Sequence, residues 1–89
     1  MSAEYEWDEA KRRSNIRKHG VDFTMIEHFE WDSATLELDT RQIEPRFIST
    51  GYVRNRLHVA VYTERDSRLR IISLRRANRR EERAYHAAP

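Results

Sequence analysis

Charged side chains follow each of the last two apolar stretches of this chain, at the points where strands would end. Glu64 and Arg65 come after the first stretch, and Arg75 and Arg76 end the second. Arginine stays charged and is rarely buried without a partner, so these residues are not expected to belong to the core. A guanidinium binds phosphate with two parallel hydrogen bonds, and a carboxylate beside it can transfer a proton next to a phosphodiester. A salt-bridged surface uses the same residue types, and both interpretations stay open.

Three more arginines follow on the next segment: Arg79, Arg80 and Arg83. Asn78 and Glu81 have the spacing of a capping box, which predicts that a helix starts here. Because a helix N-terminus offers free N–H groups to an anion, a phosphate is expected between Arg76 and Arg79. Alternatively, Glu81 and Glu82 pair with these arginines at helical spacing, which contributes only tenths of a kcal/mol per pair.

Other side chains have both a chemical and a structural interpretation. His19 can act as a general acid or base, because its unperturbed pKa lies near neutrality, or it can be a cation at a helix C-terminus. Tyr85 can stack on a base or pack on the sheet, and Glu64 can simply stabilise a turn. The tryptophans are expected in the core. The remaining histidines lack metal-ligand spacing, so no metal site is expected: His28, His58 and His86.

The charge of the chain is divided between its halves. The 89 residues carry a net charge of +2, but residues 1–45 hold 11 acidic and 6 basic side chains, and residues 46–89 hold 4 acidic and 11 basic ones. Fifteen of the 17 basic residues are arginine, which favours recognition of phosphate, carboxylate or stacked bases over simple solvation. The basic half is therefore predicted to be the working surface.

Length and composition limit the class of protein. A chain of 89 residues is expected to form one domain, spanning 1–89, with a small core. The absence of cysteine excludes disulfides and thiolate chemistry. No apolar run approaches the ~20 residues of a membrane span, and no signal-peptide pattern is present. We expect a cytoplasmic protein without a cofactor.

Hydrophobic periodicity predicts an α+β fold of order β-α-α-β-β-β-β-α. Asp8 and Gly20 suit the two ends of a first helix, and Asp22 suits the N-cap of a second one. The connections between the four later strands are short, so an antiparallel meander is expected. In the last strand, period two places Arg70, Ile72, Leu74 and Arg76 on one face and Leu69, Ile71, Ser73 and Arg75 on the other. The predicted strands are 5–7, 34–39, 47–52, 57–62 and 69–74.

Taken in order, several short motifs of this chain resemble the BrnT family of bacterial toxins, from about residue 5 to residue 85. The resemblance rests on Trp7-Asp8, Lys18-His19-Gly20-Val21, Arg46-Phe47-Ile48 with Gly51, Val61 to Arg65, Arg70 to Ser73, Arg75-Arg76-Ala77 and Arg79-Arg80-Glu81.

The resemblance implies a RelE/ParE-like fold and a place in a type II toxin–antitoxin system, in which a ribonuclease toxin stops translation. It implies a BrnA-like antitoxin, with two toxins and two antitoxins in a heterotetramer. The antitoxin would carry the DNA-binding domain, so that operator DNA is bound only through it. An antitoxin segment is expected to cover residues 64–85.

On this hypothesis, RNA is cleaved without a metal when the ribose 2′-OH attacks the adjacent phosphate. Arg65, Arg76 and Arg79 would hold that phosphate, and Lys18 would add positive charge. Glu64 or His19 would accept the proton. Tyr85 would stack on a base or donate a proton. Further RNA contacts are expected from Arg70, Arg75, Arg80 and Arg83. Two alternatives remain: a ParE-like toxin that acts on DNA gyrase, and a non-catalytic module that binds nucleic acid or antitoxin.

Overall fold

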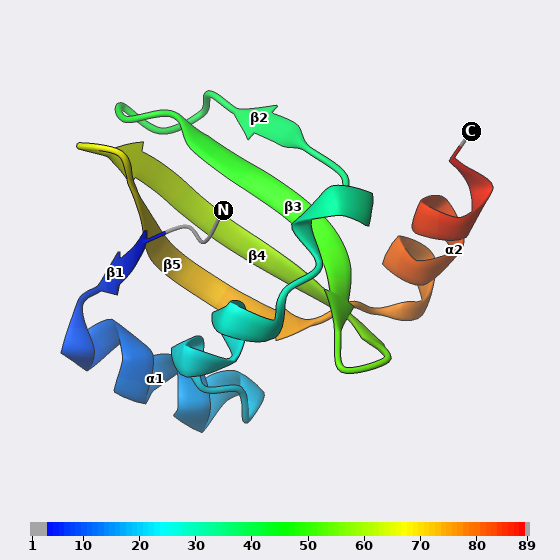
Figure 1. The fold of residues 1–89 in the computed structure, drawn as a ribbon, viewed down its shortest axis with the longest axis horizontal. Helices are drawn as coiled ribbons and strands as arrows, with labels where there is room; N and C mark the ends of the chain where they lie inside the picture. The colour runs from blue at the N-terminus through cyan, green and yellow to red at the C-terminus, as the bar shows by residue number, and fades with distance from the viewer. Residues whose placement is uncertain (1–3, 89) are drawn as a thin grey trace.

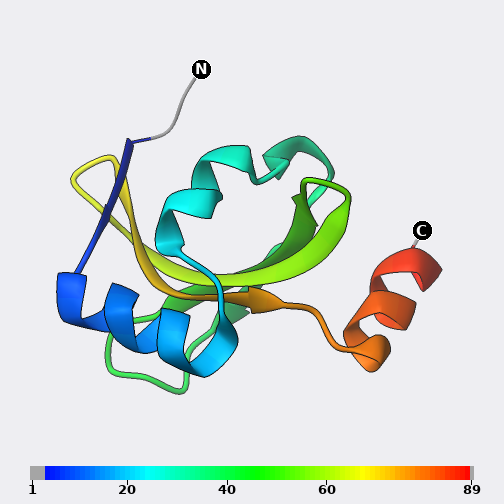
Figure 2. The same ribbon diagram turned by 90° about the horizontal axis from the view of Figure 1, so that it is seen from below.

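The computed structural model describes residues 4–88 and contains a mixed five-stranded sheet accompanied by helices (Figure 1). In both views α1 and α2 lie far apart, on opposite sides of the molecule (Figures 1 and 2). The elements in chain order are β1 (Glu4–Trp7), α1 (Glu9–His19), η1 (Phe23–His28), η2 (Trp31–Ser33), β2 (Glu37–Asp39), β3 (Arg46–Val53), β4 (Arg56–Arg65), β5 (Arg68–Arg76) and α2 (Arg79–Ala87).

The strand order is β1-β5-β4-β3-β2. The predicted antiparallel meander is confirmed for β2 to β5, but it is wrong for β1, which pairs in parallel with β5. Opposite charges line this pair: Arg68 binds Glu4 and Arg70 binds Glu6, each at 3.0 Å. The partner of β1 lies some sixty residues further along the chain, so local periodicity could not identify it.

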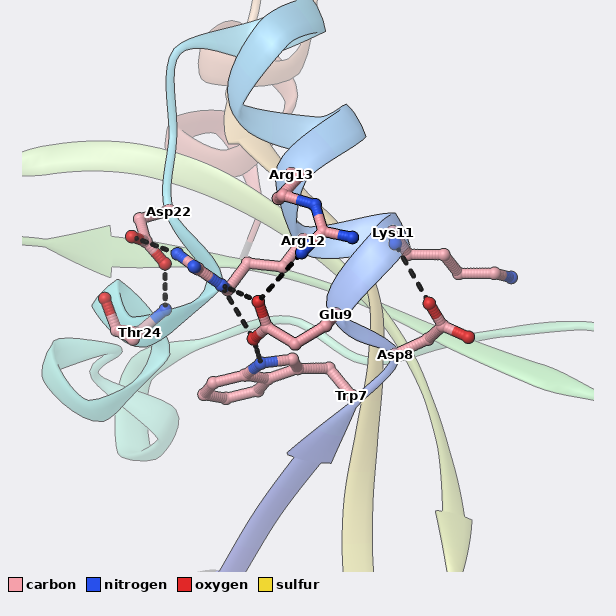
Figure 3. Close-up of polar contacts among 8 residues, drawn as sticks. All are labelled: Trp7, Asp8, Glu9, Lys11, Arg12, Arg13, Asp22 and Thr24. Atoms are coloured by element: carbon pink, nitrogen blue, oxygen red, sulfur yellow. Dashed lines mark hydrogen bonds and ion pairs between the residues drawn. The ribbon is translucent and has the colours of Figure 1, made fainter.

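The first helix begins and ends as predicted. The Asp8 carboxylate accepts a hydrogen bond from the Lys11 N–H at 3.1 Å, and Gly20 adopts the left-handed conformation (φ 70°) that ends the helix. Glu9 binds the Arg12 guanidinium and accepts a hydrogen bond from Trp7 Nε1 (Figure 3). These contacts join the end of β1 to the first turn of α1.

The second predicted helix is a 3-10 helix, η1, and not an α-helix. Asp22 is its N-cap, as predicted, and accepts a hydrogen bond from the Thr24 N–H. Phe23 and Ile26 are both fully buried. Their spacing of three residues fits three residues per turn, which places both side chains on one side of a 3-10 helix.

The predicted strand 34–39 is shortened to β2. Thr35 reaches β3 differently, because its hydroxyl accepts a hydrogen bond from the Thr50 N–H at 3.0 Å while its own N–H donates to the Thr50 carbonyl. Leu36 and Leu38 are exposed. Ala34, at the start of the predicted strand, packs against the core.

A β-bulge overturns the predicted faces of the last strand. Val61 pairs with Ser73 and Tyr62 pairs with Ile71, so Ile72 has no partner in β4. The bulge places Ile71 and Leu74 on the same face although they are three residues apart, and both are core residues. Arg76 shares this core face, whereas Arg70, Ser73 and Arg75 point to the second face.

Asn15 completes the edge of β5. Pairing with β1 stops at Ile71. Beyond it, the Asn15 amide donates to the Leu74 carbonyl at 2.6 Å and accepts from the Leu74 N–H at 3.3 Å. It also donates to the Val21 carbonyl at 2.9 Å. The side chain is only 6% exposed, so it replaces a neighbouring strand in a place that water hardly reaches.

No residue of α2 is buried, so the helix depends on polar contacts for its attachment to the sheet. Both Glu81 carboxylate oxygens accept hydrogen bonds from Arg75 at 2.8 Å, and Glu81 also closes the predicted capping box with Asn78. Tyr85 donates to the Ser33 carbonyl at 2.9 Å and meets the Tyr52 ring edge-on. The helix is therefore fixed at its first turn and near its end.

We predict that Asn15→Ala lowers the free energy of unfolding by about 2–4 kcal/mol, because buried backbone groups of Leu74 and Val21 lose their partners. Urea unfolding followed by circular dichroism measures the change. Ser14→Ala, one position earlier on the same helix, is the matched control. Equal stability of the two variants would show that Asn15 does not support the strand edge.

A second prediction concerns the attachment of α2. Hydrogen bonds from Arg75 lower the pKa of Glu81 to about 2, from an ordinary value of 4.5. Because the folded-state pKa is the lower one, the contribution of Glu81 to stability is fully present above pH 4.5 and is lost as the pH falls toward 2. Glu81→Gln should reduce hydrogen-exchange protection of α2 amides about tenfold at pH 7.

The matched control for this variant is Glu82→Gln, which removes a carboxylate from the same helix turn. The protection deficit of Glu81→Gln should shrink between pH 4.5 and pH 2. A deficit that is independent of pH would contradict the ionic origin of the attachment.

Candidate nucleic-acid-cleaving site

The arginines divide into two groups according to whether a carboxylate lies within 4.0 Å. At the end of β5 that begins the strand, Arg65, Arg68 and Arg70 pair with glutamates, namely Glu44, Glu4 and Glu6. At the other end, no carboxylate among residues 4–88 pairs with the cations Lys18, Arg54, Arg56, Arg76, Arg79, Arg80 and Arg83. Uncompensated cations at one end of the sheet are suited to bind an anion.

The fold separates the predicted site residues. Arg65 pairs with Arg68 across the β4–β5 hairpin, whereas Arg76 lies eight residues further along β5. At roughly 3.3 Å per residue, this is a distance of about 26 Å. Glu64 and Arg65 therefore cannot contact the same phosphate as Arg76 and Arg79. The C-terminal ends of two consecutive antiparallel strands lie at opposite ends of their hairpin, so the end of β4 with Glu64 and Arg65 is far from the end of β5 with Arg75 and Arg76.

Lys18 and His19 lie at the Arg76 end of the sheet. They belong to the last turn of α1 and line a hollow of about 250 Å³ that also includes Ser73, next to the bulge in β5. Gly20, the following residue, lines the same pocket as Arg76. The structure thus brings Lys18 and His19 into the neighbourhood of Arg76, through the contact of α1 with β5.

Arg76 lines a pocket of about 400 Å³, which we call the Arg76 pocket. Its lining consists of Gly20, Val21, Asp22, Met25, Val53, Arg54, Arg56, His58 and Arg76. His58 lies opposite Arg76 in the β4–β5 pair and is 6% exposed. Burial lowers the pKa of His58, and the charges of Arg76 and Arg56 lower it further, against the opposing effect of a hydrogen bond to the Arg56 carbonyl. The imidazole is therefore neutral at pH 7.

Sequence reasoning missed His58 because it considered this residue only as a metal ligand. Period two places His58 on the same strand face as Ala60 and Tyr62, and the structure buries this face of β4. Because a buried polar side chain is less common than a buried apolar one, a histidine on the buried face of a strand indicates a specific role.

Two other predicted site residues are engaged in holding α2. The Arg75 guanidinium is bound by Glu81, and the Tyr85 hydroxyl donates to Ser33. Both side chains line a groove of about 400 Å³ on the second face of the sheet, together with Val59 and Val61. The packing interpretation of Tyr85 accounts for its position.

A capping box lies at the N-terminus of α2, where a phosphate is predicted to bind. The Glu81 carboxylate accepts the Asn78 N–H, and the Asn78 side chain accepts the Glu81 N–H. The Glu81 carboxylate therefore binds the Asn78 N–H and Arg75, and among residues 4–88 it forms no ion pair with Arg76 or Arg79. Arg79, Arg80 and Arg83 are exposed on the helix.

Within residues 4–88, no three His, Asp or Glu side chains are grouped so that they could hold a metal ion. Cleavage without a metal stays a prediction. In the same part of the chain, no helix has the length and apolar character needed to cross a membrane.

Comparisons with known proteins agree on one family. Residues 7–81 match the family described as the ribonuclease toxin, BrnT, of type II toxin–antitoxin systems. The crystal structure of the Brucella abortus ribonuclease toxin BrnT, at 1.1 Å resolution, is similar with a TM-score of 0.72 and 29% sequence identity, over 88% of this chain and 100% of that one. No curated protein sequence matches. The chain belongs to the BrnT family of ribonuclease toxins of type II toxin–antitoxin systems.

Proposed function

We propose that this toxin is an endoribonuclease that stops translation by cleaving RNA, through attack of the ribose 2′-OH on the adjacent phosphate. The observation that carries the proposal is the concentration of uncompensated cations where β5 ends and α2 begins. In phosphoryl chemistry of this kind, positive charge fixed beside the phosphorane lowers the barrier directly. Family membership supports the reaction class.

The roles divide according to where the residues lie. Arg76 would bind the scissile phosphate, with Lys18 adding charge from α1 and Arg79 from α2. Arg80 and Arg83 would hold neighbouring phosphates. His19 is a proton-transfer candidate at this end of the sheet, and Tyr85 offers its ring beside the groove. We assign Arg70 and Arg75 to structure, since Glu6 and Glu81 neutralise them.

Type II systems pair each toxin with an antitoxin, and we propose a BrnA-like protein in this role. It would cover the cations of β5 and α2, which are accessible to RNA when no antitoxin is bound. Two copies of each chain would form the heterotetramer, and operator DNA would be bound only through the antitoxin. The place of action would be the cytoplasm, where RNA is translated.

The location of the site can be tested by replacing Arg76 at the end of β5 and Arg65 at the β4–β5 hairpin. Arg76→Ala should reduce RNA cleavage by about 10²-fold, the effect typical of losing a charge-stabilising donor, and should relieve growth arrest on induction in bacteria. RNA integrity and growth are followed together. Arg41→Ala is the control, because Arg41 pairs with Asp39 beside β2.

Full toxicity of Arg76→Ala together with loss of cleavage in Arg65→Ala would place the site at the β4–β5 hairpin instead. Arrest with intact RNA and reduced DNA supercoiling would indicate a gyrase toxin. Soluble wild-type protein that neither arrests growth nor cleaves RNA would indicate a binding module.

The antitoxin surface gives a further prediction. Reversing two charges with Arg76→Glu and Arg79→Glu should weaken binding of the cognate antitoxin at least tenfold, as measured by titration calorimetry, because both side chains lack a carboxylate partner of their own among the described residues. Arg41→Glu serves as the control. Unchanged affinity of the double variant would place the antitoxin on another surface.

A further inference from the structure

We propose that His58 is the general base of the cleavage reaction and that the Arg76 pocket holds the scissile phosphodiester. The proposal rests on the ribonuclease function proposed above and names a residue for a role that the predicted candidates do not fill well. Glu64 belongs to β4 and lies opposite the start of β5, far from Arg76. His19 lines the neighbouring hollow and not this pocket.

The hydrogen bonding of His58 leaves one ring nitrogen free. Its Nδ1 lies 2.8 Å from the Arg56 carbonyl oxygen. A carbonyl can only accept, so Nδ1 carries the hydrogen and Nε2 carries the lone pair. Within residues 4–88, Nε2 has no hydrogen-bond partner, and it is not among the side-chain atoms that are sealed from solvent. A side chain that is 6% exposed thus presents a proton acceptor to the pocket.

The positive charges around His58 come from three parts of the pocket wall. Arg54 belongs to the β3–β4 turn, Arg56 to β4 and Arg76 to β5, and none of the three has a carboxylate partner in the described part of the chain. Arg54 contacts His28 at 3.1 Å, which adds no negative charge. Three guanidinium groups without a counter-ion around one pocket create a site for an anion.

The one carboxylate in the pocket wall is already used. Asp22 accepts a hydrogen bond from Arg12 at 2.8 Å and another from the Thr24 N–H at 3.0 Å, and Figure 3 shows both contacts. These two partners lower the pKa of Asp22, so the carboxylate stays ionised and bound to them. Among residues 4–88, no carboxylate is therefore left to neutralise Arg76.

The electrostatics suit a base that works only when substrate is present. In the empty pocket, burial and the neighbouring arginines lower the pKa of His58, which keeps the imidazole neutral and able to accept a proton. A bound phosphodiester brings a negative charge, and negative charge favours the imidazolium. Binding of the substrate thus strengthens the base.

The chemical step balances as follows. The 2′-hydroxyl oxygen attacks phosphorus while its proton passes to His58 Nε2. The bond between phosphorus and the 5′-oxygen breaks, and that oxygen takes a proton from water. The imidazolium then returns its proton to the hydroxide. The products are a 2′,3′-cyclic phosphate and a 5′-hydroxyl end, and the arginines hold the phosphorane oxygens. A volume of about 400 Å³ lies in the range of small-ligand pockets.

The site can be tested without cleavage by nitrogen-15 NMR of wild-type protein. The probe is a thymidine dinucleotide, whose phosphodiester lacks a 2′-OH. We expect a neutral His58 with hydrogen on Nδ1 at pH 7, and a change in its Nε2 resonance and a raised pKa when the dinucleotide is added. His86, on α2, should not respond. A His58 that ignores the dinucleotide would overturn the phosphodiester site.

The base is tested by single-turnover cleavage of an RNA transcript between pH 5 and pH 8. His58→Gln should lower the rate by about 10²- to 10⁴-fold at pH 7 and remove the fall in rate on the acidic side. His86→Gln is the matched control, since this exposed histidine of α2 lines neither the Arg76 pocket nor the hollow beside Lys18 and His19. Circular dichroism confirms that each variant is folded.

The outcomes separate the two proposals. If His19→Gln removes the acidic limb and His58→Gln keeps it, His19 is the base and this inference is wrong. If wild-type protein does not cleave RNA, the proposed function fails and the base assignment with it. In that case the dinucleotide titration still decides whether the Arg76 pocket binds a phosphodiester.

Discussion

The edge of β5 that faces away from β4 must be covered, and the arrangement of β1 and α1 depends on this constraint. Segments from both ends of the chain meet at β5. β4 pairs with one edge of this strand, and β1 and the Asn15 side chain share the other edge. An uncovered edge would leave backbone groups unpaired and open to association with other chains. By binding Leu74 and Val21 at once, Asn15 fixes α1 against the second half of β5. This contact brings Lys18, His19 and Gly20 to the end of the sheet that holds Arg76.

Charge is used differently at the two ends of this strand. Near its start, arginines are matched by glutamates of β1 and of the segment before β3, so they contribute to structure. Near its end, in the described part of the chain, only Arg75 has a carboxylate partner, which is the glutamate that also caps α2. Exposed ion pairs contribute little stability. Their larger effect here is to neutralise one end of β5 and to leave the other end attractive to phosphate. The similarity to a ribonuclease toxin of Brucella abortus fits this distribution.

The bulge in β5 links packing to the candidate site. Without it, Arg76 would share a face with Arg70, and Ile71 would lie opposite Leu74. With Ile72 unpaired, both Ile71 and Leu74 enter the core, while Arg76 reaches the pocket of His58 and Arg75 turns to Glu81 on the second face. Two adjacent arginines thereby receive different tasks. Arg75 attaches the C-terminal helix through Glu81, and Arg76 has no carboxylate partner among residues 4–88.

Local features of this chain could be predicted from its sequence alone. The caps at Asp8, Gly20, Asp22 and Asn78 and the antiparallel run from β2 to β5 depend on near neighbours, and the structure confirms them. The resemblance to the family came from ordered motifs, and the family match confirms it. Tertiary structure alone decided the parallel pairing of β1, the role of Asn15, the bulge at Ile72 and the separation of Glu64 from Arg76. These depend on which distant segment completes an edge and on which side chains share a core, and periodicity within one segment carries no information about either.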